Sequence, residues 1–187
     1  MDQVTIKDFQ GTTGIGGFKY ALVLRKISKK YFRFFPLKSL DSTESTRVFR
    51  EFCKTILKGD LTTIAELVVY SDAHRSLIKI CDNLNLSRDH SPPGRPQANA
   101  VAERTVGDCL AGIRSYLSSG CLPDCFWPQA GEAYSINNSI VENITESTSA
   151  PEGETEETTM SIYESVTGSP WKGEMFLPGQ LVYFKPA

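Results

Sequence analysis

The sequence is poor in histidine, with only His74 and His90 in 187 residues. Its five cysteines form no Cys-x-x-Cys pair, so the paired ligands of a zinc finger are missing, and their odd number indicates free thiols in a reducing compartment. The chain also lacks an apolar run long enough to cross a bilayer, and residues 1–3 do not begin a signal peptide. We therefore expect an intracellular protein that is neither secreted nor membrane-bound.

The acidic residues are unevenly distributed along the chain. The segment from Glu142 to Glu157 contains six glutamates and no lysine or arginine; outside it 20 basic residues face 16 acidic ones, a net charge of +4 against −2 for the whole chain. Local basic clusters matter more for phosphate binding than total charge, so this balance is compatible with nucleic-acid binding. Residues 142–159 show no apolar periodicity, and we predict an acidic flexible loop that lies away from a nucleic-acid-binding face because its charge repels phosphate.

Strand signals come first in the chain. Three β-rich segments with tight connections predict an antiparallel meander: Val4–Phe9, Phe18–Ile27 and Tyr31–Phe35. Leu67–Tyr70 is a continuous apolar run of the kind that is buried in a sheet. It leads directly into Ser71-Asp72, and polar residues at the carboxyl end of a buried strand are favoured places for chemistry in α/β folds.

Helical spacing of apolar residues predicts a helix capped by Ser42 or Thr43, a short helix over 77–84 before a polar connection to His90, and later helices. The clearest runs from Ala98 to about Ser118, after the helix-breaking segment Ser91–Gly94. Further segments are predicted as a helix over 126–138, a helical turn over 162–166 and a final strand over 179–184.

The start of the predicted helix at Ala98 carries a specific pattern around Glu103. Its neighbours four residues away are Asn99 and Gly107, and a carboxylate with small neighbours can take a metal ion or a phosphate close to the helix surface. A solvated surface glutamate is the alternative. The pattern Pro-Gln-x-Asn-x-x-x-Glu-Arg over 96–104 resembles the segment that carries the catalytic glutamate of retroviral and retrotransposon integrases, and most resembles Copia-type elements.

The resemblance extends to two further carboxylates and to downstream motifs. Asp8, in Lys-Asp-Phe-Gln-Gly, is similar to the family's Asp-x-x-Gly, and Asp72 is similar to its Ser-Asp; Leu-Pro-x-x-Phe-Trp over 122–127 and Ser169-Pro170 also match. The resemblance implies an RNase H-like α/β fold, with a five-stranded mixed sheet (antiparallel meander plus parallel strands) flanked by helices. It implies a catalytic core over 1–141, the acidic loop over 142–159, and an extension over 160–187 that begins a further module.

The implied activity is metal-dependent polynucleotidyl transfer, with cleavage near the 3′ end of an element and strand transfer into target DNA. Asp8, Asp72 and Glu103 would hold Mg²⁺ (or Mn²⁺), because hard divalent cations take carboxylate oxygens and paired ions can hold both the attacking and the leaving oxygen. Taken singly, Asp8 suits a strand-end turn and Asp72 suits a helix cap. Their joint order on two strands and a helix favours the metal site.

The same resemblance implies DNA as the partner, both element ends and target, and a homo-oligomer working in the nucleus or in a cytoplasmic particle. Residues that flank Glu103 and would face DNA are Arg95, Gln97, Asn99 and Arg104. Lys29 and Lys30 are candidate phosphate contacts, although a hairpin turn is an ordinary place for lysine. Arg104 could equally pair with Asp108 four residues later.

Two departures from the family pattern keep other functions open. Only 30 residues separate Asp72 from Glu103, fewer than is usual in the family, and Ala73-His74 replaces the asparagine and glycine that usually follow the second aspartate. One alternative is a catalytically inactive integrase fold that acts as a nucleic-acid-binding or interaction module. Another is a metal-dependent nuclease of the same fold that hydrolyses DNA without strand transfer.

Overall fold

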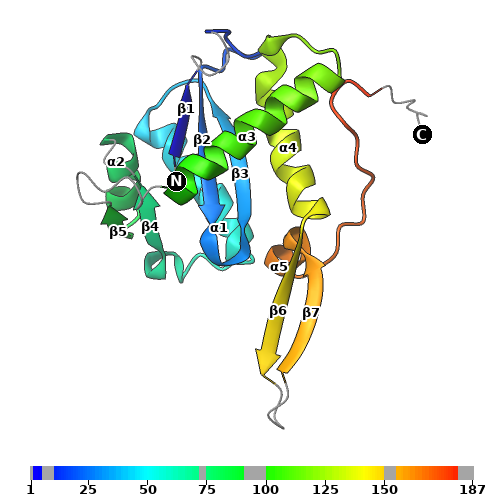
Figure 1. Ribbon diagram of the computed structural model, residues 1–187. Helices are drawn as coiled ribbons and strands as arrows, with labels where there is room; N and C mark the ends of the chain where they lie inside the picture. Colours follow the sequence, from blue (N-terminus) through cyan, green and yellow to red (C-terminus); the bar gives the residue numbers. More distant parts are fainter. Residues whose placement is uncertain (1, 6–10, 72–74, 91–99, 150–154, 181–187) are drawn as a thin grey trace, which may run out of the picture.

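The computed structural model describes residues 2–5, 11–71, 75–90, 100–149 and 155–180. Seven strands and five α-helices lie in these ranges (Figure 1). The strands are β1 Asp2–Thr5, β2 Tyr20–Lys26, β3 Tyr31–Leu37, β4 Val68–Ser71, β5 Ser87–His90, β6 Asn143–Ser149 and β7 Thr155–Ser161. The helices are α1 Ser42–Ile56, α2 Arg75–Asn83, α3 Ala100–Ser119, α4 Trp127–Val141 and α5 Ile162–Thr167.

The antiparallel meander predicted for the start of the chain is confirmed in its order and pairing. Its first strand, predicted over Val4–Phe9, is β1 Asp2–Thr5, and residues 6–10 lie outside the described residues. β2 pairs with β3 along its whole length, from Tyr20↔Leu37 to Lys26↔Tyr31, and β1 lies on the other edge of β2. The turn between β2 and β3 is the short 3-10 helix η2, Ile27–Lys29, followed by Lys30 with a left-handed backbone (φ 56°).

Strand β2 is covered by helices on both faces, which explains its unbroken apolar sequence. Leu22 and Leu24 point to a core formed with α1, α2 and α5, whereas Ala21 and Val23 point to a second core formed with α3 and α4. Because successive side chains of a strand point to opposite faces, one apolar run serves both cores. Figure 1 shows α3 and α4 crossing one face of this sheet, with α1 on the other.

Helix α1 shows how a local signal sets an element's start. The carboxylate of Asp41 accepts a hydrogen bond from the Thr43 N–H at 3.2 Å, so the cap is Asp41 and not the predicted Ser42 or Thr43. Seven residues of α1 are buried, and five of them form the α1 side of the first core: Val48, Phe49, Phe52, Cys53 and Ile56. Of the helices in the described ranges, none combines the length and the apolar character that a membrane span requires.

The segment before residue 91, predicted as a polar connection to His90, is a strand of a second sheet. β4 and β5 pair in parallel, from Val68↔Ser87 to Ser71↔His90, so the four residues before residue 91 form a strand. Their sequence, Ser-Arg-Asp-His, has no apolar alternation, and pairing with β4 determines the strand. In the described residues the strands form sheets of three, two and two strands, and a single five-stranded sheet is not shown.

The predicted flexible loop over 142–159 is corrected to a hairpin in its described part. β6 and β7 pair antiparallel from Asn143↔Ser161 to Ser149↔Thr155. Threonine favours extended backbone, and the Thr145 and Thr159 hydroxyls lie 3.2 Å apart across the pair. The hairpin projects from the body of the protein beside α5 (Figure 1), and Ile144 near its base packs against the first core.

Candidate active site and nucleic-acid interface

Helix α3 presents Glu103 at the surface in its first turn. The buried face of α3 is formed by Thr105, Cys109, Ile113 and Leu117, and Glu103 lies off that face. A carboxylate near a helix N-terminus is stabilised by the partial positive charge of the unpaired backbone N–H groups. The structure therefore leaves this acidic side chain accessible, as a ligand for a cation requires.

The first turns of α3 and the carboxyl end of β4 border one cavity of about 500 Å³. From α3 the cavity is lined by Val101, Ala102 and Thr105, and from β4 its lining includes Tyr70. Ser71, which ends β4, is buried. Asp72 follows Ser71 in the sequence but lies, like Asp8, outside the described residues, so the structure describes one of the three predicted carboxylates.

A further carboxylate stands at this edge of the sheet. Asp89 on β5 is the register partner of Tyr70 on β4. A hydrogen bond to the Asp89 side chain and the negative charge of that carboxylate raise the pKa of Tyr70. Sequence analysis missed Asp89 because this segment was predicted to be a connection. Had a strand parallel to β4 been predicted there, the polar residues of that strand would have been expected at the same edge of the sheet.

Arg25 joins the central sheet to the helix that carries Glu103. Its Nη1 donates a hydrogen bond to Thr105 Oγ1 at 2.6 Å, and the Thr105 hydroxyl donates to the Val101 carbonyl at 2.7 Å. Burial lowers the pKa of Arg25, with Asp108 opposing this and Arg104 adding to it. Arg25 thus fixes the first turns of α3 against β2 while its positive charge stays close to Arg104.

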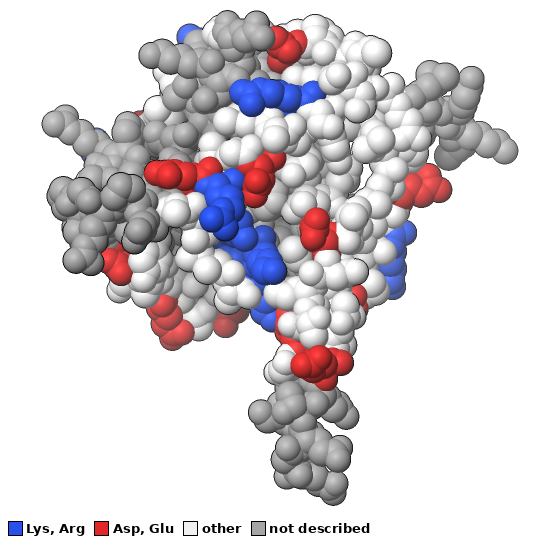
Figure 2. Space-filling model, viewed as in Figure 1, with Lys and Arg blue, Asp and Glu red and all other residues white. Residues whose placement is uncertain are grey.

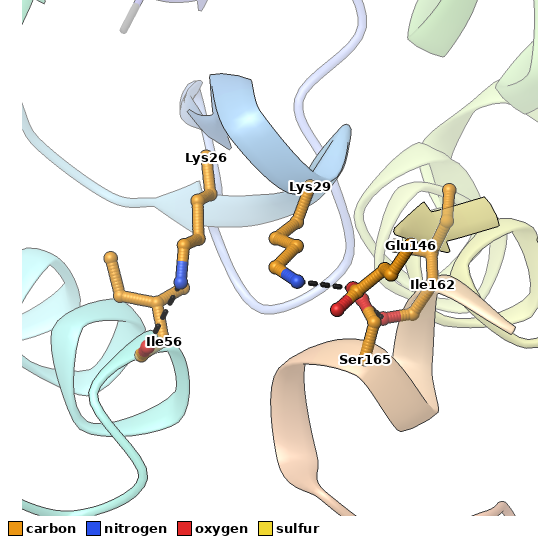
Figure 3. A network of polar contacts seen from close by, with 6 residues as sticks. All are labelled: Lys26, Lys29, Ile56, Glu146, Ile162 and Ser165. Atoms are coloured by element: carbon orange, nitrogen blue, oxygen red, sulfur yellow. Dashed lines mark hydrogen bonds and ion pairs between the residues drawn. The ribbon is translucent and has the colours of Figure 1, made fainter. Parts of the chain in front are cut away.

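The lysines at the end of β2 gather near the start of the β6–β7 hairpin. Lys26 Nζ donates to the Ile56 carbonyl at 3.3 Å, and Lys29 forms an ion pair with Glu146 of β6 (Figure 3). Burial lowers the pKa of Lys26; Lys29 and Lys58 lower it further, and Glu146 raises it. The ammonium groups of Lys29 and Lys58 therefore both lie within electrostatic reach of Lys26.

The predicted DNA-facing residues have different outcomes. Arg104 is exposed, and within the described part of the chain no ion pair joins it to Asp108. Lys30 lines a groove of about 580 Å³ between α3 and α4, together with Arg25, whereas Lys29 is held by Glu146. The other three predicted contacts lie outside the described residues: Arg95, Gln97 and Asn99.

Basic side chains extend across this face of the molecule. In Figure 2 a line of blue side chains runs from the N-terminal part of α3 toward the base of the hairpin. Sequence analysis selected Lys29 and Lys30 but missed Arg25 and Lys26; four basic residues within six positions of the chain were the available signal.

Two further kinds of site bear on function in the described ranges: clustered metal ligands and reactive thiols. There, no group of three or more His, Cys, Asp or Glu side chains is placed to hold a metal ion. Burial raises the pKa of Cys53 and of Cys109 to about 12, so neither thiol is a nucleophile at neutral pH. The notable charged groups are Glu103, Asp89 and the basic residues Arg25 and Arg104.

Comparison with known proteins gives matches among solved structures. The chain matches no protein-family model and no curated protein. A chain of the simian T-cell lymphotropic virus intasome, solved in complex with the PP2A regulatory subunit B56 gamma, is similar over 93% of this chain with a TM-score of 0.57 and 13% sequence identity. This chain spans 57% of that intasome chain.

A second match is the catalytic core domain of BIV integrase, with 12% identity, a TM-score of 0.48, and coverage of 80% of this chain and 86% of that one. The likeness to the intasome chain is too low in identity to carry more than the fold. The chain has an integrase-like α/β fold.

Proposed function

We propose that this chain is the catalytic core of a retrotransposon-type integrase, most like those of Copia elements, and that it acts on DNA as a metal-dependent polynucleotidyl transferase. The observation that carries the proposal is the exposed Glu103 carboxylate in the first turn of α3, in a chain with an integrase-like fold. Val101 and Ala102 of the same turn line one cavity with Tyr70 near the carboxyl end of β4. The motifs around Glu103, Asp72 and Asp8 agree with it.

The donor set suits a hard divalent cation. Glu103, Asp72 and Asp8 would hold Mg²⁺ or Mn²⁺, whose charge would stabilise the attacking and leaving oxygens of a phosphodiester during in-line displacement. Glu103 is exposed, and the cavity beside α3 extends to Tyr70, two residues before Asp72. Asp89, at the same edge of the sheet, adds negative charge that would favour a bound cation.

The surrounding residues would bind and orient DNA. Arg25 holds α3 in place through Thr105, which sets the position of Glu103 two residues earlier. Arg104 is exposed next to Glu103, and Lys30 lines the groove between α3 and α4, so both can contact phosphates. A homo-oligomer working in the nucleus or in a cytoplasmic particle completes the proposal, since the intasome relative is itself an assembly.

A strand-cleavage and strand-transfer assay tests this function. The probe is a labelled duplex oligonucleotide incubated with Mg²⁺ or Mn²⁺, comparing wild type, Glu103→Gln and Glu44→Gln. Glu44 is the matched control because it also lies in the first turn of a helix, α1, on the other side of the sheet. We expect wild type and Glu44→Gln to yield shortened and transferred strands, and Glu103→Gln to lose at least about a hundredfold in rate.

Thermal melts in EDTA and in metal distinguish the alternative. A functional site predicts that Mg²⁺ or Mn²⁺ raises the melting temperature of wild type but not of Glu103→Gln, and that the variant is as stable as wild type or slightly more so in EDTA, because neutralising one clustered carboxylate relieves repulsion. DNA binding by wild type without cleavage and without a metal response would identify an inactive, nucleic-acid-binding integrase fold instead. Cleavage products without transferred strands would identify a nuclease.

A further inference from the structure

The acidic hairpin touches the protein at a basic cluster. Lys29 of η2 forms its ion pair with Glu146 on β6, and both side chains are about three-quarters covered, with 26% and 29% of their side-chain surface exposed. Figure 3 shows the Lys29 ammonium directed at the Glu146 carboxylate, with Lys26 directed the other way toward the Ile56 carbonyl. The two residues are 117 positions apart in the sequence, so they meet only because the chain folds.

Two more ammonium groups accompany Lys29 in this cluster. Lys26 lies within electrostatic reach of both Lys29 and Lys58, and the Glu146 carboxylate opposes their effect on it. Lys58 reaches Gly168, which caps the C-terminus of α5. These groups together carry three positive charges and one negative charge, and we call Lys26, Lys29 and Lys58 the lysine cluster.

The hairpin is negatively charged, as a nucleic-acid backbone is, and its charge is opposite to that of the lysine cluster. The segment from Glu142 to Glu157 carries six glutamates and no basic residue, so it is a polyanion like a phosphodiester chain. Glu146 places an anionic oxygen against the Lys29 ammonium, as a phosphate oxygen of a bound nucleic acid would. Partly exposed ion pairs are weak, and a polyanion that releases counterions can compete with this one.

We propose that the lysine cluster is a contact site for a nucleic-acid backbone, and that the β6–β7 hairpin is its internal competitor, with Glu146 holding Lys29 until a phosphate replaces it. The inference rests on the proposed function for the nature of the ligand. It assigns the acidic segment a role in limiting DNA affinity, whereas charge alone suggested that the segment lies away from DNA.

Two substitutions that break the same ion pair should have opposite effects. Glu146→Gln removes the competitor and leaves Lys29 available, so affinity for DNA rises. Lys29→Gln removes the contact itself, so affinity falls. A role for the ion pair in stability alone would move both variants in the same direction. Lys29→Arg keeps the charge and should stay close to wild type.

The experiment measures binding of a short labelled DNA duplex by fluorescence polarisation in EDTA over a salt series. We expect Glu146→Gln to lower Kd about two- to fivefold and to steepen the dependence of log Kd on log salt by up to about one unit, as one additional phosphate contact predicts. Lys29→Gln should raise Kd by a similar factor, and the double variant should bind no more tightly than Lys29→Gln.

Glu157→Gln is the matched control for net charge. Glu157 is exposed on β7, so this variant removes one negative charge from the same hairpin without touching Lys29. An equal gain in affinity from Glu157→Gln would overturn the proposal, as would a gain from Lys29→Gln or a Glu146→Gln variant that does not bind DNA. Tighter binding by Glu146→Gln with no cleavage in metal would retain this inference and reject the proposed enzyme.

Discussion

The protein contains two hairpins of the same length that are built in opposite ways. β2–β3 and β6–β7 each pair seven residues with seven in antiparallel register. In the first hairpin most side chains are aliphatic or aromatic and buried between helices on two faces. In the second the side chains are mainly Thr, Ser and Glu, and most of those described are exposed.

The difference shows that the same backbone ladder can rest on different sources of stability. Apolar burial contributes about 25 cal/mol per Å², so β2–β3 is stabilised chiefly by the two cores. β6–β7 depends on β-propensity, on cross-strand pairs such as Thr145 with Thr159, and on its base, where Ile144 packs against the first core. The first hairpin organises the fold, and the second is attached to it.

The largest expected effect comes from the buried hairpin. Phe34 has no exposed surface, and its ring meets Trp127 edge-on with centroids 6.0 Å apart. Phe34→Ala should cost about 3–5 kcal/mol in the free energy of unfolding, because it removes transfer energy and leaves a cavity. Thr145→Ala on β6 should cost under about 1 kcal/mol. Urea denaturation followed by circular dichroism measures both, and comparable losses would contradict the comparison.

How well the fold could be predicted follows from the same contrast. The meander and the helices α1, α2, α3, α4 and α5 were predicted because their apolar residues repeat at the period of the structure they form. β5 and the β6–β7 hairpin were missed because their residues, Ser-Arg-Asp-His and Thr-Glu-rich segments, carry no apolar period. Strands of that kind are determined by the neighbour with which they pair, and a single-sequence pattern does not contain that neighbour.

The candidate site divides along a similar line. The sequence placed Glu103 in the second turn of a helix from Ala98. The structure shows it exposed in the first turn of α3, which begins at Ala100. The bond from Arg25 to Thr105 spans 80 residues of sequence, and the pair of Lys29 with Glu146 spans 117, so neither could be read locally. Asp8 and Asp72 lie outside the described residues, and their convergence with Glu103 stays a prediction.

A smaller effect is expected from removing the outer part of the acidic hairpin. Residues 146–158 can be replaced by a short glycine-containing turn, because Thr145 and Thr159 are register partners and already adjacent. Unfolding should stay cooperative, and the free energy of unfolding should fall by about 1 kcal/mol or less. Loop length contributes little to this free energy, and few core contacts are removed. Loss of soluble, cooperative unfolding in calorimetry would show that the hairpin belongs to the core after all.

The smallest expected effect is the coupling between the two hairpins through Lys29 and Glu146. A double-mutant cycle with Lys29→Gln, Glu146→Gln and the double variant isolates it, because each substitution removes the same ion pair with little change in volume. The expected coupling is about 0.2–1 kcal/mol at low salt, as for other partly exposed pairs, and it should fall toward zero at about 1 M salt, where screening acts within roughly 3 Å. A weak coupling of this size is what allows a phosphate to displace Glu146. A coupling of several kcal/mol that resists salt would make the pair a structural lock, and the two hairpins would then have to be regarded as one unit.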